Sequence, residues 1–226
     1  MSQSRPTAVA SRTQTAYEQL RHDLIAGRLL PGDRLKINEL SLSLGVSLGA
    51  VREALSRLTS EELVVAEPQR GFRVAGVSIA DLRDLTMVRV EIEGMCLRRS
   101  IACGDVAWES LVVAAFHALS RTAESDGGNG GPGENWLQAH AAFHRALVSA
   151  CGSAWLLRLQ GLLYAQSERY RCLSLAGGGS GRDAQAEHQE IVEAVLTRSA
   201  DRAAALLKAH FETTSRILES KVRSMA

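Results

Sequence analysis

Several features that mark other protein classes are missing from this sequence of 226 residues. Aromatic residues make up only 4% of it, and no apolar run reaches the about 20 residues that a membrane-spanning helix needs. The start of the chain lacks the apolar core of a secretory signal. No Cys-x-x-Cys pair occurs among the four cysteines, Cys96, Cys103, Cys151 and Cys172. We therefore expect a cytoplasmic protein with no membrane partner and with buried, reduced thiols rather than disulfides or zinc ligands.

The chain also lacks a strong net charge. Its 26 Lys and Arg residues are balanced by 25 Asp and Glu residues, which leaves a formal charge of +1. A nucleic-acid-binding role therefore cannot be inferred from bulk charge and must depend on where individual arginines lie. The content of 46% hydrophobic and 23% charged residues is that of an ordinary globular protein. The length favours two modest domains, each able to bury its own core.

Residues 14–77 have the pattern of a winged helix-turn-helix. Residues 14–26 place Leu20 and Leu24 on one helical face, and a short helix over 37–44 ends at Gly45. Ser47 is a good N-cap for a third helix. From residue 63 to residue 74 the spacing of apolar residues changes from helical to that of two short strands joined by a turn at 68–71. This pattern predicts the β-hairpin wing of the domain. Residues 1–13 are expected to form a flexible N-terminus.

Residues 78–226 predict an all-α helical bundle, so the expected fold class is mainly α. Ser78 and Asp81 have capping-box spacing at the start of the first helix. Glycine-rich runs at 126–133 and 176–181 lack the flanking strand and Lys-Ser/Thr pair of a phosphate-binding loop, so we interpret them as flexible interhelical loops. The six expected helices span about 79–102, 105–124, 135–151, 153–174, 183–198 and 200–223.

The outward face of the third N-terminal helix is a candidate DNA-reading surface. A helix over 48–58 turns an apolar stripe inward, namely Val51, Ala54, Leu55 and Leu58, which leaves Gly49, Arg52, Glu53 and Ser56 outside. Leu48 falls at the exposed N-terminal end. An arginine on such a face can grip guanine through two parallel hydrogen bonds. Arg52 is therefore a candidate base reader, and an ordinary surface arginine paired with a neighbouring glutamate or with solvent stays an alternative.

Four of the six histidines fall on apolar helical stripes of the C-terminal region. His140 and His144 are four residues apart, so their rings project from the same face as a chelating pair. His188 and His210 each share a stripe with aliphatic residues. Helical bundles build metal sites from inward side chains on facing helices. Each histidine alone is more simply a core residue, but four together point to a metal site.

Residues 17–74 resemble the winged-helix domain of the GntR family in four segments, LRHDLIAGRLLPGDRL, NELSLSLGVS, AVREALSRL and EELVVAEPQRGFRV. The resemblance implies that the third helix enters the major groove of DNA and that the wing tip touches the minor groove or the DNA backbone. It implies that Arg52 reads bases and that Arg70 and Gly71 form the wing contact. It also implies that Lys36 and Asn38 lie near DNA phosphates.

One departure from the family concerns the start of the third helix, where Ser47, Leu48 and Gly49 are candidate DNA contacts. The family usually has an arginine after the serine or threonine of this segment, and here Leu48 follows Ser47. Leucine cannot donate a hydrogen bond, although it can touch a thymine methyl group. The operator sequence therefore does not carry over from the family.

Residues 80–220 resemble the FCD ligand-binding domain of the FadR-type branch, through MVRVEIEG, AAFHRAL and AEHQEIVEAVLTRSADRAAALLKAH. The six helices are similar to the VanR-type variant. The resemblance implies a metal held by His144, His188, His210 and an aspartate four residues before His144. His140 occupies that aspartate position. Four neutral nitrogen ligands favour zinc or nickel over manganese and leave the charge of a divalent transition metal uncompensated.

Such a centre suits an anionic effector, and two arginines are candidates to bind it. Arg89 matches a family position that faces the effector cavity, and Arg169 on the 153–174 helix is assigned the same role. Arginine beside a metal suits a small carboxylate through bidentate pairing. A salt bridge between Arg89 and Glu93, one helical turn away, is the alternative for Arg89.

The favoured function is a homodimeric, metabolite-responsive repressor that binds a palindromic operator in double-stranded DNA and is not an enzyme. A metal sensor, in which the ion itself is the signal, is a second hypothesis. A metal-dependent hydrolase with Glu187 as base is a third. It leaves the winged helix unexplained, and four histidines would close the open position that a catalytic metal needs.

Overall fold

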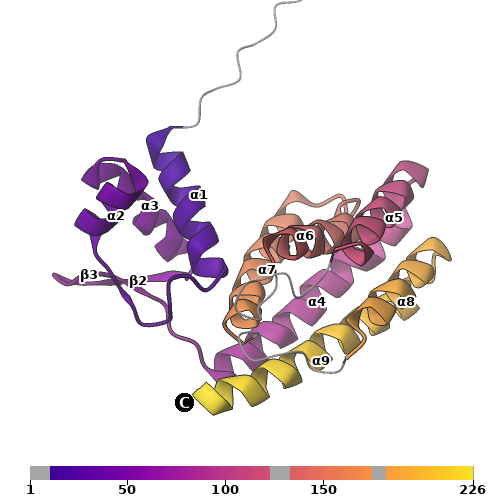
Figure 1. The fold of residues 1–226 in the computed structure, drawn as a ribbon. Coiled ribbons are helices and arrows are strands. Elements are labelled where there is room, and N and C mark those ends of the chain that lie inside the picture. Colours follow the sequence, from indigo (N-terminus) through magenta and orange to yellow (C-terminus); the bar gives the residue numbers. More distant parts are fainter. Residues whose placement is uncertain (1–10, 123–132, 175–181, 226) are drawn as a thin grey trace, which may run out of the picture. The chain divides into compact units, whose positions relative to one another are not determined.

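The computed structural model describes residues 11–122, 133–174 and 182–225. Figure 1 shows the elements, which divide into two compact units, Met1–Gly76 and Val77–Ala226. Residues 1–10 of the expected flexible N-terminus lie outside the described residues. So do the two glycine-rich runs, apart from Gly133, which caps a helix.

The first unit is a winged helix-turn-helix. It contains helices α1 (Arg12–Ile25), α2 (Ile37–Leu44) and α3 (Leu48–Ser60) and strands β1 (Arg34–Leu35), β2 (Val64–Glu67) and β3 (Gly71–Val74). The strands form an antiparallel sheet in the order β1-β3-β2, and Val64 faces Val74 while Glu67 faces Gly71. The expected fold is confirmed.

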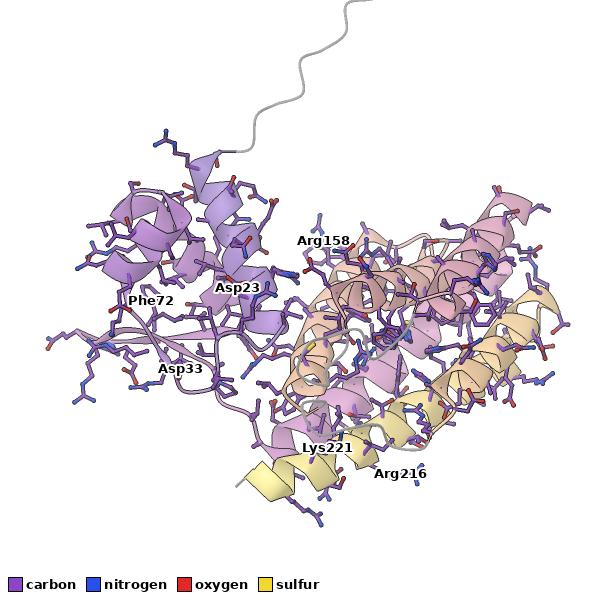
Figure 2. The ribbon with its side chains drawn as sticks, viewed as in Figure 1. Asp23, Asp33, Phe72, Arg158, Arg216 and Lys221 are labelled. Carbon is purple, nitrogen blue, oxygen red and sulfur yellow. The ribbon has the colours of Figure 1, made fainter. Side chains whose placement is uncertain are left out.

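Local chemistry explains where these elements begin and end. The Ser47 hydroxyl accepts a hydrogen bond from the Ala50 amide at 3.2 Å and caps α3. Gly45 ends α2 in the left-handed region at φ +64°. Asp33 lies just before β1 (Figure 2). Its carboxylate oxygen accepts a hydrogen bond from the Leu30 amide at 3.0 Å. Phe72 on β3 packs against the core of this unit (Figure 2).

Two features of this unit differ from the sequence-based expectation. Helix α1 begins at Arg12, with Ser11 as its N-cap, so residues 12 and 13 belong to the helix and Ser11 caps it, rather than forming part of a flexible terminus. Strand β1 was not expected, because two residues are too short to show an alternating pattern. It pairs Leu35 with Phe72 and closes the sheet beside the wing.

The second unit is an all-α bundle, as expected. Its helices are α4 (Ile79–Cys103), α5 (Val106–Ser120), α6 (Glu134–Val148), α7 (Ala154–Ser174), α8 (Ala184–Leu196) and α9 (Ala200–Met225). The long helix α4 packs along α9 and α7, while α5 packs on α6 and α8 packs on α9 (Figure 1). Helix α5 stops four residues before the expected 124, and α6 stops three residues before 151. The Ser78 hydroxyl caps α4 by accepting from the Asp81 amide at 3.1 Å.

Two further expectations concern the thiols and the membrane. All four cysteines are free, and Cys96 and Cys151 are buried. Cys103 is exposed, which corrects the expectation of burial: it is the last residue of α4, where the helix leaves the core. Over the described ranges, no helix has the length and apolar character needed to cross a bilayer.

Candidate functional site

The exposed face of α3 carries the candidate base-reading residues. The four stripe residues predicted to point inward are fully buried, whereas Leu48 is 46% exposed and Gly49 and Arg52 are also exposed. Within the part of the chain that the structure describes, the Arg52 guanidinium has neither a hydrogen bond nor an ion pair, so the alternative pairing with a glutamate is not seen. An unpaired arginine at the start of this helix is free to meet a base edge.

A second basic surface lies between the wing and the start of α2. A surface cavity of about 470 Å³ is lined by Arg34, Lys36, Asn38, Arg70 and their neighbours. Nη2 of Arg34 donates to the main-chain oxygen of Arg70 at 3.0 Å and so braces the wing turn. Lys36 is exposed and pairs with Glu39 at 2.8 Å, a surface contact that DNA phosphates can replace at little cost. Arg34 was missed, because nothing in the sequence shows that it faces the wing.

The four predicted histidines meet in the core of the second unit. His140 and His144 come from α6, His188 from α8 and His210 from α9, and all four are buried. One ring nitrogen from each lies within 4.8 Å of the others. Nε2 of His140 and Nε2 of His144 are 3.1 Å apart. The structure therefore brings the whole predicted set to one point.

The electrostatic environment keeps these imidazoles neutral. Burial, reinforced by nearby arginines, lowers the pKa of His140, His144 and His210 and lowers the pKa of His188 to about 2. At His210 the hydrogen bond to Glu187 opposes this lowering of the pKa without reversing it. Two buried ring nitrogens, His144 Nδ1 and His188 Nε2, have no hydrogen-bond partner among the described residues. Four neutral imidazoles, each with one ring nitrogen within 4.8 Å of the others, fit a divalent transition metal such as zinc or nickel.

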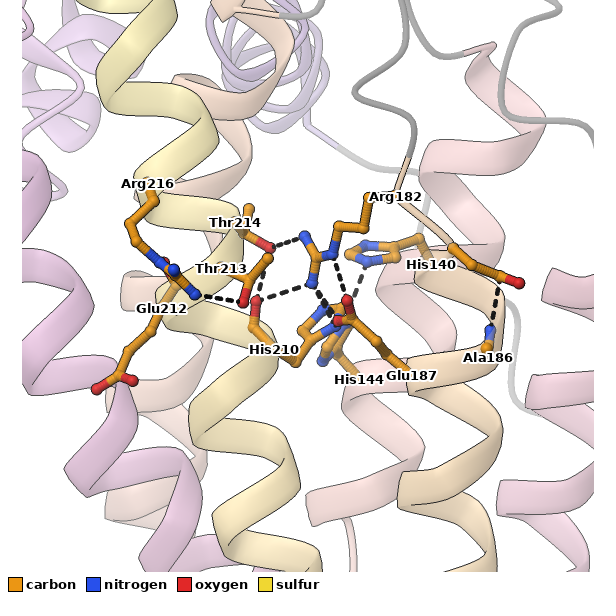
Figure 3. Close-up of polar contacts among 11 residues, drawn as sticks. His140, His144, Arg182, Ala186, Glu187, His210, Glu212, Thr213, Thr214 and Arg216 are labelled. Carbon is orange, nitrogen blue, oxygen red and sulfur yellow. Dashed lines mark hydrogen bonds and ion pairs between the residues drawn. The ribbon is translucent and has the colours of Figure 1, made fainter.

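A carboxylate sets the orientation of one of these rings. Nδ1 of His210 lies 2.9 Å from Oε2 of Glu187, so this nitrogen donates and Nε2 keeps its lone pair (Figure 3). Burial alone would raise the pKa of Glu187, but hydrogen bonds from Arg182 and His210 outweigh it and bring this pKa to about 2. Glu187 is thus a hydrogen-bonded support for His210, which argues against a role as hydrolytic base.

Arg182 forms hydrogen bonds with several groups around His210. Its Nε donates to Glu187 Oε1 at 2.6 Å, and its Nη1 donates to the Thr214 hydroxyl at 2.7 Å (Figure 3). Nη2 donates to the main-chain oxygen of His210 at 3.0 Å. Because Glu187 lies on α8 and His210 and Thr214 lie on α9, this one guanidinium links the two helices.

The opposite side of the cluster holds His140. Trp136 stacks on its ring at a centroid distance of 4.6 Å, and the Tyr164 hydroxyl lies 3.0 Å from its Nδ1. Glu168 is ion-paired with Arg171, whose guanidinium lies over the Trp136 ring at 4.3 Å. His140 is therefore held at its ring face and at its outer nitrogen, which leaves Nε2 toward the other histidines.

The histidines line a cavity of about 70 Å³ to which three arginines also contribute, Arg89, Arg171 and Arg182. Arg89 donates to Glu93 at 2.8 Å and to the Ser167 hydroxyl at 2.5 Å. Both sequence-based placements of Arg89, in the cavity and beside Glu93, thus occur together. Arg169 does not line this cavity: its Nη1 donates to Gln166 at 3.3 Å. Arg171 and Arg182 were missed by sequence reasoning, since both lie outside the quoted motifs.

Two protein-family profiles match the chain. The profile of the FCD domain matches residues 84–213, and that of "Bacterial regulatory proteins, gntR family" matches residues 12–74. The chain belongs to the GntR family of bacterial regulatory proteins, with a C-terminal FCD domain. It is accordingly a DNA-binding transcriptional regulator.

Relatives extend over most of the chain. The HTH-type transcriptional regulator BphR of Paraburkholderia xenovorans is 41% identical over 91% of this chain and 84% of its own length. The HTH-type transcriptional repressor GlaR of Escherichia coli is 34% identical over 90% of this chain and 94% of its own length. Among solved structures, E. coli McbR/YncC matches with a TM-score of 0.82 at 21% identity, covering 95% of this chain and all of that protein. This last likeness shows the shared fold.

Proposed function

We propose that this GntR-family regulator is a homodimeric repressor whose DNA binding responds to a small carboxylate bound beside a divalent transition metal. The metal would be held by His140, His144, His188 and His210, with zinc or nickel as the expected ion. The observation that carries the proposal is the set of four buried, neutral imidazoles around one point. When bound, the metal supplies a concentrated positive charge that attracts an anion.

The fixed charges around the cluster favour an anion only when a metal is present. Each arginine of the cavity already faces a glutamate, in the pairs Arg89–Glu93, Glu168–Arg171 and Arg182–Glu187. These charges balance one another, and the histidines are neutral. A divalent ion would therefore add an uncompensated charge, and a carboxylate is the simplest ligand to offset it.

Operator binding by a pair of chains is supported by an exposed apolar face on α7. Trp155 is 73% exposed, and Leu159 and Leu162, one and two turns further on, are 43% and 39% exposed. A second copy covering this face would bury it and would pair two winged helix-turn-helix units on a palindromic site. The relative GlaR carries the name of a repressor, and we propose the same action here.

Elemental analysis and DNA release test the proposal together. Protein purified without chelator is expected to carry up to one zinc or nickel ion per chain. Operator fragments selected from a random DNA pool should then be released by a small carboxylic acid only when the metal is loaded. Release by the metal ion alone would instead identify a metal sensor. A protein that stays empty when offered zinc and nickel would contradict the metal-based mechanism.

A further inference from the structure

The tip of the wing carries a residue in an unusual backbone conformation. Gln69 has a φ of +62°, in the left-handed region that residues other than glycine and asparagine rarely adopt. It is the third residue of a turn in which the Arg70 amide donates to the main-chain oxygen of Glu67 at 3.0 Å. A turn with a positive φ at this place favours glycine or asparagine. Glutamine therefore stands here against the local preference of the backbone.

Two other non-glycine residues among those that the structure describes have a positive φ, and each has a local reason. Glu62 directly follows the C-cap of α3, where helices commonly end on a left-handed residue. Nη1 of Arg198 donates to the main-chain oxygen of Ile101 at 2.6 Å, a contact that offsets the strain. Gln69 has no comparable contact, because its side chain is exposed and its carboxamide makes no hydrogen bond within the described ranges.

Gln69 lines the basic cavity of about 470 Å³ between the wing and the start of α2. Three cationic side chains and a second carboxamide line the same cavity, namely Arg34, Lys36, Arg70 and Asn38. A single carboxylate opposes the three cations. Because the chain is a DNA-binding regulator, this charge suits the phosphates of one DNA strand.

A DNA strand in this cavity would have the wing on one side and α2, with the adjoining α3, on the other. A sugar–phosphate backbone separates the major groove from the minor groove. If the exposed face of α3 reads the major groove, the tip of the wing lies over the minor groove beyond that strand. There an A·T pair offers adenine N3 and thymine O2 as acceptors, whereas a G·C pair also presents the guanine amino group as a donor. Glutamine side chains can read this difference.

We propose that Gln69 determines specificity by reading one base pair through the minor groove, with its Nε2 donating to adenine N3 or thymine O2. The cations of the cavity hold the phosphates of the intervening strand, and the left-handed backbone places the carboxamide at the apex of the turn. This role concerns the DNA-binding activity of the chain and does not depend on metal or carboxylate sensing.

Gln69→Met tests the hydrogen bond, because methionine keeps the length and the left-handed cost of the side chain but removes both polar atoms. Operators would be selected from a random DNA pool with native and variant proteins, and affinities would be measured by fluorescence anisotropy. The variant should lose a preference for A·T at a defined position of the site and bind the native operator about tenfold more weakly. Its affinity for random DNA should stay at the native value. An equal loss on random DNA would make Gln69 a backbone contact and overturn the proposal.

A base analogue shows which groove is read. An inosine·cytosine pair has the minor-groove acceptors of A·T but the major-groove pattern of G·C. At the position that the Gln69→Met selection identifies, native protein should bind inosine·cytosine as tightly as A·T and bind G·C about tenfold more weakly. Gln69→Met should bind all three equally. If inosine·cytosine weakens native binding as much as G·C does, the contact lies in the major groove and the proposal is wrong.

The backbone strain gives an independent measurement. Gln69→Gly relieves the left-handed conformation, so its midpoint of chemical unfolding should rise while its operator affinity falls as in Gln69→Met. Glu62→Gly is the matched control, because it relieves the same strain at an exposed position outside the cavity. It should also raise the midpoint but leave operator affinity at the native value. Native operator affinity in Gln69→Gly would show that the glutamine has no part in DNA binding.

Discussion

The carboxylate of Glu187 accepts a hydrogen bond from Nδ1 of His210 at 2.9 Å and so directs the other ring nitrogen toward the histidine cluster. Glu187→Gln would replace this anion with a neutral amide of similar shape. Loss of such an outer partner typically weakens metal binding about 10- to 100-fold. Competition with a chromophoric chelator would measure the change. Glu190→Gln, an exposed position on the same helix, should leave the affinity at the native value.

His140 and His144 should respond differently to substitution. His144→Ala removes a ring from the middle of the cluster, where it lies within 5.6 Å of the other three by ring centroids, and should abolish metal binding. His140→Asp should retain the metal, because a carboxylate can replace the imidazole. The added negative charge should weaken binding of an acid such as acetate. Metal-free His140→Asp protein, or unchanged acetate affinity, would contradict this assignment.

The stability of the metal-stripped protein should depend on pH through the buried histidines. Burial lowers the pKa of His144 and His188 in the folded state, while an unfolded imidazole titrates near about 6.5. The unfolded chain therefore takes up protons first, and stability present above about pH 6.5 is lost as the pH falls below it. Chemical unfolding at several pH values between 7.5 and 5.5 would show how steeply the free energy of unfolding falls with pH. His188→Phe should flatten this dependence, whereas His117→Gln, at an exposed histidine, should not.

Arg52 and Arg70 should affect DNA binding in distinguishable ways. Arg52→Ala should cost about 1 to 3 kcal/mol on the selected operator and relax base preference at one position in each half-site. Arg70→Ala should weaken selected and random DNA alike and flatten the dependence on salt, as expected for a phosphate contact. An equal loss on both DNAs for Arg52→Ala would remove it from the base-reading residues.

Leu48 offers a test of operator choice. It lies at the first position of α3, next to the Ser47 cap. Leu48→Arg should supply a guanine donor that the native helix lacks and shift the consensus selected from a random DNA pool. If native and variant proteins select the same consensus, position 48 does not read bases.

Sequence periodicity predicted most of the fold because long amphipathic helices repeat their signal many times. The stripe from Val51 to Leu58 and the histidines of α6, α8 and α9 were placed on the correct faces for this reason. Strand β1 was not predicted, because its pairing with β3 depends on residues almost 40 positions away in the sequence. Placing Arg169 in the cavity and overlooking Arg171 shows the limit of the method: two positions move a side chain by more than half a helical turn.

The residues that support the cluster were harder to find than the cluster itself. Arg182 precedes α8 and reaches His210 and Thr214, so its role depends on how α8 packs on α9. Arg34 similarly contacts the wing from a different strand. Sequence spacing describes neighbours on one helix, but contacts between helices need the tertiary structure.

The two uncommitted ring nitrogens, His144 Nδ1 and His188 Nε2, have a consequence for the cell. A buried polar atom without a partner costs on the order of 1 to 3 kcal/mol, a sizeable part of the whole folding free energy of a domain. An ion that binds only the folded chain stabilises it in proportion to the availability of the ion. Metal starvation would therefore increase proteolytic turnover of the regulator, and the number of molecules, as well as their occupancy, would follow the metal supply.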